Sequence, residues 1–317
     1  MRRHVIASST LDALARALGP QARRDEPVAP YTAMQIGGPA NVLVTCETVD
    51  QVVRAVRLAR RHELPWRLLG GGCNVLVADE GLDGVVIINR ADRVTLEGRT
   101  IRAETGAQMS TVARLAVEQG LAGLAWATGL PGSVGGAVVG NAGAFEGNIA
   151  GVLTSASVYE PGGDVTERPA EWFEFDYRLS RIKRQAAGDR RPVVLEAAFQ
   201  LEPGDPAQLA ARAREIREWR RTRHPSGATV GSTFKNPPGG HAGYLIEQAG
   251  LRGYRIGGVE VSEIHGNFLM NVGGGTAADM MALIDHIQRE IKDQFDIDLE
   301  LEIELIGRIS GEGSTQR

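Results

Sequence analysis

The fold is decided by Thr128-Gly129-Leu130-Pro131-Gly132-Ser133-Val134-Gly135-Gly136-Ala137, which is followed closely by Asn141-Ala142-Gly143-Ala144. This stretch lies in an uncharged run, 120–145, whose glycines include the four-residue spacing of membrane helix-packing motifs. Abundant glycine and the proline at 131 work against a stable helix, because glycine costs backbone entropy and proline lacks the amide donor. We therefore expect a loop that approaches a ligand closely, and no membrane insertion.

Working outward, another glycine loop, Gly70-Gly71-Gly72-Cys73-Asn74, follows a predicted short strand at 66–69. With no side chains in the way, several backbone N–H groups can turn toward one anion, which suits a pyrophosphate. Taken alone, an ordinary glycine turn explains this loop equally well. Neither loop contains G-x-G-x-x-G or a G-K-[ST] ending, so a Rossmann dehydrogenase and a P-loop enzyme are both disfavoured.

Hydrophobic periodicity and turn residues predict an α+β chain. Strands are expected at 41–46, 66–69, 85–88, 94–96, 100–103 and 152–160, and helices at 50–62, 109–119, from 205 onward and at 277–294. Thr48, Asp205 and Thr276 are predicted helix caps, and Pro203-Gly204 marks a boundary. We expect a domain boundary at 202–205 and a flexible tail at 310–317.

The two glycine loops resemble the FAD-binding loops of the UDP-N-acetylenolpyruvoylglucosamine reductases, a family with the vanillyl-alcohol-oxidase type of FAD-binding fold. The resemblance covers nearly the whole chain and adds Ile36-Gly37-Gly38-Pro39-Ala40, Tyr177-Arg178-Leu179-Ser180, Gly231-Ser232-Thr233-Phe234-Lys235-Asn236-Pro237 and 299–307. It implies two FAD-binding subdomains, 1–80 and 81–204, and a smaller substrate-binding domain, 205–309. The chain is similar to the shorter class of the family, which lacks an extra tyrosine-bearing substrate loop. Cys73 departs from the pattern, since serine is usual there.

The resemblance implies an enzyme, UDP-N-acetylmuramate dehydrogenase, that acts in peptidoglycan precursor synthesis and so in cell wall biogenesis, cell shape and cell division. Its cofactors are expected to be FAD and NADPH. NADPH reduces the flavin, which then transfers hydride to UDP-N-acetyl-3-O-(1-carboxyvinyl)glucosamine and gives UDP-N-acetylmuramate. The alternatives are an FAD-dependent oxidase of the same wider fold and a nonenzymatic nucleotide-sugar sensor.

Three catalytic residues follow from the resemblance. Arg178 is expected to hold the substrate carboxylate where negative charge develops, Ser232 to donate a proton, and Glu302 to polarise the enolate. Without the resemblance, Arg178 reads as a surface ion-pair residue and Ser232 as a local hydrogen-bonding residue of a turn. Alternation over 299–304 places Glu302 on one strand face with two other glutamates, 300 and 304, and cannot choose among them.

Binding residues also follow from the resemblance. The residues expected to bind FAD are Gly70, Gly71, Gly72, Cys73, Asn74, Thr128, Gly129, Pro131, Gly132, Ser133, Gly135, Gly136, Asn141 and Gly143. Those expected to bind the substrate are Tyr177, Arg223, Lys235, Asn236 and Asn267. Arg220 and Arg221 are read as complements of their helix dipole, without a phosphate role. Gly273-Gly274-Gly275-Thr276 reads as a helix entry loop.

Composition bounds the partners. A formal net charge of −4 and a pI near 5.9 provide no basic field for extended nucleic acid. Only two cysteines are present, and the amino-terminal residues do not read as a secretory signal, so a reducing cytoplasm is expected. The histidines and cysteines form no spaced metal set. The oligomeric state is left open.

Overall fold

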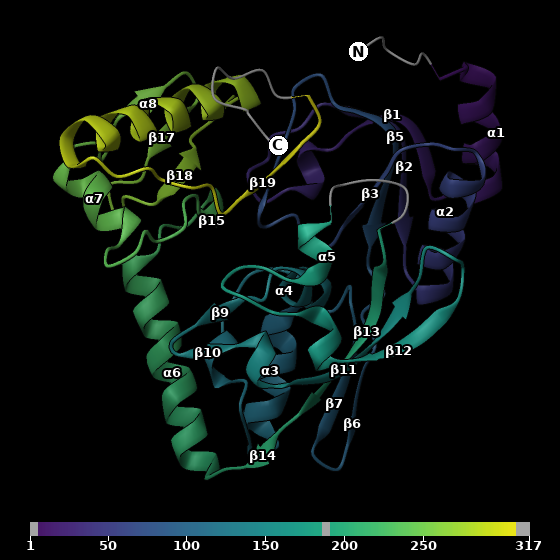
Figure 1. Ribbon diagram of the computed structural model, residues 1–317, viewed down its shortest axis with the longest axis horizontal. Coiled ribbons are helices and arrows are strands. Elements are labelled where there is room, and N and C mark those ends of the chain that lie inside the picture. Colours follow the sequence, from purple (N-terminus) through teal and green to yellow (C-terminus); the bar gives the residue numbers. More distant parts are fainter. Residues whose placement is uncertain (1–5, 186–190, 309–317) are drawn as a thin grey trace. The chain divides into compact units, whose positions relative to one another are not determined.

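The computed structural model describes residues 6–185 and 191–308, and it divides into two compact units. Unit 1 comprises 1–24, 41–71 and 84–220, and unit 2 comprises 25–40, 72–83 and 221–317. The ribbon in Figure 1 follows the chain through both. The predicted boundaries at 80 and 204 remain predictions, and the predicted tail at 310–317 lies outside the described residues.

Unit 1 holds most of a four-stranded sheet in the order β1-β2-β5-β3. These strands are β1 (Ala22–Pro27), β2 (Pro39–Cys46), β5 (Leu82–Asn89) and β3 (Trp66–Leu69). The helices α1 (Ser8–Leu18) and α2 (Val49–Arg61) share its core, where Leu14, Val44 and Val56 are fully or nearly buried. Thr48 caps α2 as predicted, since its side chain accepts the Gln51 N–H at 3.3 Å, and the helix begins at Val49, one residue before the predicted start.

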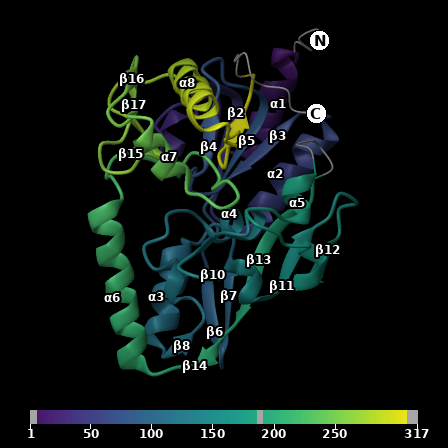
Figure 2. The same cartoon turned by 60° about the vertical axis from the view of Figure 1, so that its left-hand side comes forward.

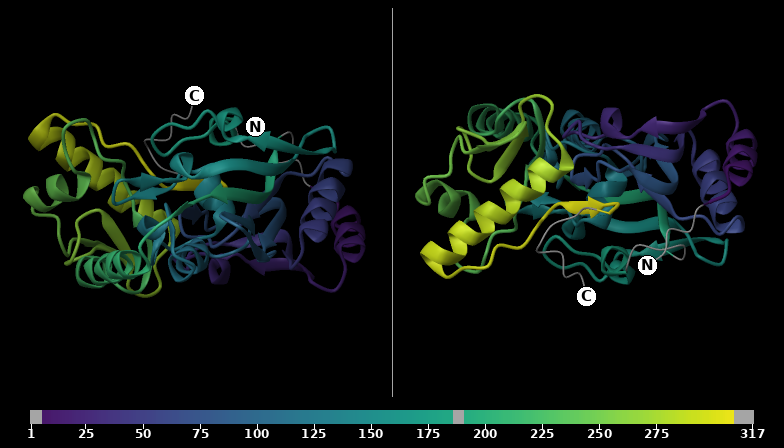
Figure 3. Two further views of the ribbon diagram at one scale, coloured as in Figure 1. Left: turned by 90° about the horizontal axis from the view of Figure 1, so that it is seen from below. Right: turned by 90° about the horizontal axis from the view of Figure 1, so that it is seen from above.

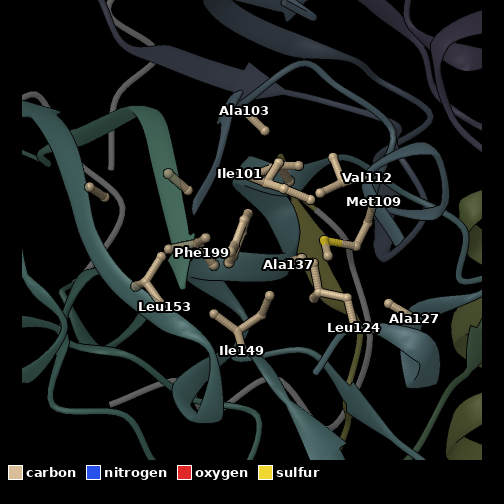
Figure 4. Close-up of a cluster of buried hydrophobic side chains, with 14 of the residues drawn as sticks. Ile101, Ala103, Met109, Val112, Leu124, Ala127, Ala137, Ile149, Leu153 and Phe199 are labelled. Atoms are coloured by element: carbon tan, nitrogen blue, oxygen red, sulfur yellow. The ribbon is translucent and has the colours of Figure 1, made fainter. Parts of the chain in front are cut away.

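A second sheet of unit 1 is antiparallel, in the order β12-β11-β13-β7-β6. Its strands are β12 (Val165–Pro169), β11 (Leu153–Tyr159), β13 (Val193–Gln200), β7 (Thr100–Glu104) and β6 (Val94–Glu97), and Figure 2 shows α3 (Met109–Glu118) beside β7. The core between them includes Ile101, Met109, Val112 and Phe199 (Figure 4). The short strands β8 (Leu121–Ala122) and β14 (Glu202–Pro203) pair at the end of this region.

The loop expected over 128–137 is wrong in one part, because Val134–Val139 forms a short helix, α4. Ser133 caps it by accepting the Gly136 N–H at 3.4 Å. Gly135 donates its N–H to the Thr105 carbonyl at 2.9 Å, and a Cβ at Gly135 would stand 2.9 Å from Thr105 Cβ. Close packing that only glycine permits therefore outweighs its poor helix propensity.

The long helix α6 (Pro206–Arg223) follows the second sheet. As predicted, Asp205 caps it: its carboxylate accepts the N–H groups of Ala207 and Gln208 at 2.8 and 3.1 Å. Other short elements of unit 1 are β9 (Gly143–Ala144), β10 (Gly147–Asn148), α5 (Arg181–Arg184) and the 3₁₀ turns η2 (Ala125–Ala127), η3 (Ile149–Gly151) and η4 (Ala170–Phe173).

Unit 2 is a four-stranded antiparallel sheet packed on two helices, α7 (Ala242–Gln248) and α8 (Ala277–Phe295). The strand order is β15 (Ala228–Ser232), β18 (Phe268–Asn271), β17 (Val259–Val261) and β16 (Arg255–Ile256). Beyond it, β4 (Val75–Val77) pairs in parallel with β19 (Glu304–Ile306), and η1 (Ala29–Tyr31) lies in the same unit. Figure 3 shows α8, in yellow, along the green strands and α7.

The glycine loop before α8 is a helix entry, as predicted. Thr276 and Asp279 form a capping box, and the Asp79 carboxylate accepts the N–H groups of Ala277 and Ala278 at 2.8 and 3.0 Å. The first N–H groups of α8 are therefore already bound by a protein carboxylate. Within 6–185 and 191–308, no helix is long and apolar enough to cross a membrane.

Candidate functional site

Unit 1 contains a cavity of about 500 Å³ that brings two of the predicted motifs together. It is lined by Asn141, Gly143, Ala144, Phe145, Glu146, Gly147, Asn148, Ala150, Phe175, Asp176, Tyr177 and Arg178. The end of the second glycine segment and the Tyr177-Arg178 motif, more than thirty residues apart in the sequence, therefore face the same space.

Arg178 occupies a tight turn. Asp176 and Leu179 exchange both backbone hydrogen bonds, at 3.0 and 3.1 Å, so Tyr177 and Arg178 form the two-residue connection. Arg178 has φ +56°, a left-handed conformation that costs a non-glycine residue about 1 kcal/mol or more. Its Nη1 donates to the Gly143 carbonyl at 2.9 Å, which holds the half-buried guanidinium against the glycine segment.

Asn141 ties the glycine segment to this turn. Its Nδ2 donates to the Asp176 carbonyl at 2.8 Å, while its Oδ1 accepts the Ala150 N–H at 3.1 Å. Asn141 itself has φ +43°. The sequence suggested a cofactor contact for Asn141, whereas these bonds use its amide to position the turn that carries Arg178. A direct contact with FAD stays a prediction.

Left-handed backbone is concentrated around the cavity. Besides Asn141 and Arg178, Phe145 and Glu146 have φ +47° and +67°, and all four line it. Non-glycine residues are held in this conformation only where the surrounding structure over-determines them, and such residues cluster at functional sites. This strain is a physical reason, independent of any resemblance, to place function here.

The two glycine loops meet within unit 1. A Cβ at Gly70 would stand 2.0 Å from Ser133 Oγ, so only glycine lets the loops come this close. The rest of the first loop, from Gly72 to Asn74, belongs to unit 2, where Gly72 has φ +61° and its added Cβ would stand 2.2 Å from the Tyr31 carbonyl oxygen. Glycine at these two positions is required by packing against other protein atoms, and ligand binding by this loop stays a prediction.

Replacing Gly70 with alanine is expected to lower the thermal midpoint and the FAD content of purified protein, because overpacking costs about 1–3 kcal/mol. Differential scanning fluorimetry and the flavin-to-protein absorbance ratio measure both. Gly162→Ala is the matched control, since the nearest atom to its added Cβ is 4.0 Å away. Equal behaviour of the two variants would show that the contact between the loops is unimportant.

Ser232 and Glu302 lie close together in unit 2. Ser232 ends β15, and the neighbouring Thr233 carbonyl accepts the Glu302 N–H at 2.8 Å. Among the described residues, no side-chain hydrogen bond engages the half-buried Ser232 hydroxyl. The local hydrogen-bonding reading of Ser232 is therefore wrong, and its hydroxyl is available for a ligand. Asn74 joins this group, since its Nδ2 donates to the Glu302 carbonyl at 3.1 Å.

The alternation expected over 299–304 is wrong as a continuous strand. β19 begins only at Glu304, and Leu301 makes an isolated bridge with Phe234. Glu300 is exposed and forms an ion pair with Lys235 at 3.0 Å. The three glutamates therefore differ in surroundings, because the chain at 299–303 follows the Ser232–Lys235 segment instead of a regular sheet edge.

The predicted substrate-binding residues differ in how exposed they are and in whether their polar groups already form hydrogen bonds within the protein. Asn267 is 3% exposed, and its amide exchanges two hydrogen bonds with the Phe234 backbone, at 2.9 and 2.8 Å. Asn236 accepts the Ala242 N–H at 3.1 Å at the start of α7. Arg223 is exposed at the end of α6, and Tyr177, in unit 1, is 54% exposed. Asn267 thus serves as an internal brace, and substrate contacts by these residues stay predictions.

Sequence reasoning missed Arg220. It is half-buried, and its guanidinium carbon lies 5.4 Å from the centroid of the Phe145 ring, which lines the cavity. Its Nε is buried without a hydrogen-bond partner, as is Thr128 Oγ1 in the second glycine loop. Orphaned donors beside a glycine loop fit an acceptor-rich cofactor such as FAD. The sequence shows only a basic helix end here.

Among the described residues, no cluster of histidine, cysteine, aspartate and glutamate could hold a metal ion.

The chain is similar to a family of flavin-dependent reductases. Family profiles described as "FAD binding domain" and "UDP-N-acetylenolpyruvoylglucosamine reductase, C-terminal domain" match residues 40–167 and 223–306. UDP-N-acetylenolpyruvoylglucosamine reductase of Rubrobacter xylanophilus is 42% identical over 298 residues, 93% of this chain and 99% of that protein. Reductase 1 of Bacillus cereus is 41% identical over 287 residues, 90% of this chain and 94% of that protein.

A solved structure of a reductase of this family has the same fold. The crystal structure of the reductase from Thermus caldophilus has a TM-score of 0.76 and 32% sequence identity, and the match covers 89% of this chain and 98% of that one. Together with the FAD-binding profile, it confirms the predicted α+β class and FAD-binding fold.

Proposed function

Since the chain belongs to the UDP-N-acetylenolpyruvoylglucosamine reductase family, we propose that it uses NADPH and FAD to reduce the enolpyruvyl ether of UDP-N-acetylglucosamine to UDP-N-acetylmuramate. The observation that carries this function is identity of about two residues in five with reductases over nine-tenths of the chain. The reaction supplies a peptidoglycan precursor, so the enzyme serves cell wall biogenesis and, through it, cell shape and division.

The cofactor site is built from the two glycine loops. FAD held there would supply the hydride transfer from NADPH to the substrate alkene. Backbone N–H groups of the loops and the orphaned Thr128 hydroxyl are the groups that would hold it. Glycine leaves these loops without side chains that would obstruct a pyrophosphate, although the N–H groups of Gly135 and Gly136 are already bonded to Thr105 and Ser133.

In this proposal, Arg178 stabilises the negative charge that develops on the substrate. Hydride addition to the terminal alkene carbon moves negative charge onto the adjacent carbon and its carboxylate. A guanidinium binds a carboxylate through two hydrogen bonds and keeps its charge at any working pH. Arg178 is the cation of the cavity in unit 1, and the hydrogen bond to Gly143 orients it before substrate binds.

Proton transfer falls to unit 2. Ser232 Oγ donates the proton that completes the reduction, and Glu302 stabilises the developing enolate. In support, the Ser232 hydroxyl makes no side-chain hydrogen bond to described residues, and the Thr233–Glu302 backbone bond keeps the two residues adjacent. Arg223, Lys235 and Asn236 anchor the UDP moiety in this proposal, Asn267 braces the Phe234 backbone beside them, and 205–309 acts as the substrate-binding domain.

We place the enzyme in the cytoplasm. Its only two cysteines, Cys46 and Cys73, do not form a disulfide with each other, which is usual in a reducing compartment. Burial raises the pKa of the Cys46 thiol to about 11, so Cys46 is inert as a nucleophile.

Anaerobic spectroscopy tests the reaction. We expect purified protein to be yellow, to bleach with NADPH, and to regain its colour when the enolpyruvyl nucleotide sugar is added, with UDP-N-acetylmuramate formed. Protein that stays reduced with this substrate but consumes oxygen with an alcohol or hydroxy acid would be an oxidase of the same fold. Protein that binds a UDP-sugar but cannot be reconstituted with FAD would be a sensor.

A further inference from the structure

Arg220 is placed against the second glycine loop by the last turns of α6. Its Cδ lies 3.5 Å from the position of a Cβ built on Gly129, so its aliphatic stem covers this glycine. Its guanidinium lies on the Phe145 ring, and the same ring packs edge-on against Trp219 with centroids 5.1 Å apart. The side chain is thus held by packing on both sides, within unit 1.

No acidic group among the described residues balances the positive charge of Arg220. Among the described residues it has no ion pair and no side-chain hydrogen bond, and its Nε is buried. By contrast, Arg212 on the same helix pairs with Glu215 at 2.7 Å. Burial lowers the pKa of Arg220, although a guanidinium remains charged at neutral pH. A half-buried cation without a partner costs free energy, which a bound anion can offset.

A second hydrogen-bond donor, the hydroxyl of Thr128, belongs to the residue that directly precedes Gly129. Thr128, next to Gly129, is 4% exposed, and its Oγ1 is buried without a partner. Gly129 has φ +70° and presents no side chain. Two unsatisfied donors from separate elements, the turn after η2 and the end of α6, therefore lie at Gly129, within the segment that the FAD-binding profile matches.

We propose that Arg220 and Thr128 bind an anionic oxygen of FAD, either in its diphosphate or at the edge of the flavin ring that becomes anionic on reduction. This inference rests on the proposed function for the identity of the cofactor. It assigns the basic end of α6 a ligand in place of the helix-dipole role that the sequence suggested. Both sources have the same chemistry, a negatively charged oxygen that takes charge-assisted hydrogen bonds.

The test is FAD affinity of the apoprotein, measured by flavin fluorescence quenching, for Arg220→Met, Arg220→Lys and Thr128→Val. Arg220→Met is expected to raise the Kd for FAD roughly 10- to 100-fold, with partial recovery in the lysine variant. Thr128→Val should raise it about 3- to 10-fold. Arg214→Met, an exposed change of the same kind on the same helix, is the matched control and should leave the Kd unchanged.

Stability of the apoprotein separates binding from structure. Because Arg220 makes no ion pair and no side-chain hydrogen bond to the described residues, and methionine can keep the packing on Phe145, Arg220→Met should leave the thermal midpoint of the apoprotein unchanged or raise it. Riboflavin, which lacks phosphate, and the flavin midpoint potential then locate the contact. A diphosphate contact leaves riboflavin binding and the potential unchanged, whereas a ring contact weakens riboflavin binding and makes the potential more negative.

An unchanged Kd for FAD in Arg220→Met would overturn the proposal. If that variant instead lost stability, Arg220 would have a structural role. If it showed only a higher KM for the nucleotide sugar, Arg220 would act on the substrate. If Arg220→Met does not fold, Arg220→Lys and Thr128→Val decide in the same way, because both keep the size of the side chain close to the original. Wild-type protein that binds FAD but does not reduce the enolpyruvyl substrate would defeat the proposed reaction and leave this inference standing.

Discussion

Ser232→Ala is expected to leave reduction of FAD by NADPH intact and to slow the reaction of reduced enzyme with the enolpyruvyl substrate about 10²- to 10⁴-fold, the usual contribution of a positioned proton donor. The reason is that flavin reduction needs no proton on the substrate carbon, whereas product formation does. Stopped-flow absorbance of the flavin measures each half-reaction separately.

A matched hydroxyl serves as the control for Ser232. Ser262, in the same unit, is 3% exposed, and its Oγ accepts the Ile264 N–H at 3.1 Å. Ser262→Ala should lower stability slightly and leave both half-reactions unchanged. Ser232→Cys should recover part of the oxidative half-reaction, because a thiol can also donate a proton. Normal turnover by Ser232→Ala would remove the proton-donor assignment.

Arg178→Gly and Arg178→Ala are expected to have different stabilities and equally low activities. Both lose the bond to Gly143 and the substrate contact, so substrate reduction should fall at least about 100-fold in each, while FAD reduction changes little. Only glycine relieves the left-handed backbone, so the glycine variant should be the more stable by about 0.5–1 kcal/mol after its greater unfolded-state entropy is subtracted.

Chemical denaturation of the two variants measures the stability difference, and stopped-flow kinetics measures the half-reactions. Arg178→Lys is the informative third variant: it keeps the charge and loses the two-pronged geometry, so it should fall between wild type and glycine. Equal stability of the glycine and alanine variants would mean that the turn relaxes without Arg178. Equal loss in both half-reactions would mean that Arg178 acts on the flavin and not on the substrate.

Local chemistry made much of the fold predictable. Thr48, Asp205 and Thr276 cap the helices that begin one residue later, and the predicted strands at 94–96 and 100–103 pair as a hairpin. Each of these depends on a few neighbouring residues, whose hydrogen bonds are satisfied within one turn. The motifs of the reductase family are likewise local strings, so the family could be recognised before any contact was known.

The surroundings of the candidate site depend on residues far apart in the chain. Glycine at 135 reads as a helix breaker until Thr105 is packed against it, and Glu300 is one of three equivalent carboxylates until Lys235 pairs with it. Whether a polar group is already satisfied depends on which partners the fold brings near. Asn267 is therefore a brace, although the sequence suggested a ligand contact.

The sequence by itself determined the family and its cofactor, because the motifs that carry the resemblance are short local runs of residue types. The candidate catalytic residues follow from that resemblance and not from the chemistry of each run taken alone. Only the tertiary structure decided that Arg178 is held in a left-handed turn tied to Asn141, and that Arg220 is half-buried beside an orphaned Thr128 hydroxyl. Burial, strain and missing partners are properties of the packed chain, and they distinguish an arginine that faces a ligand from one that ends a helix.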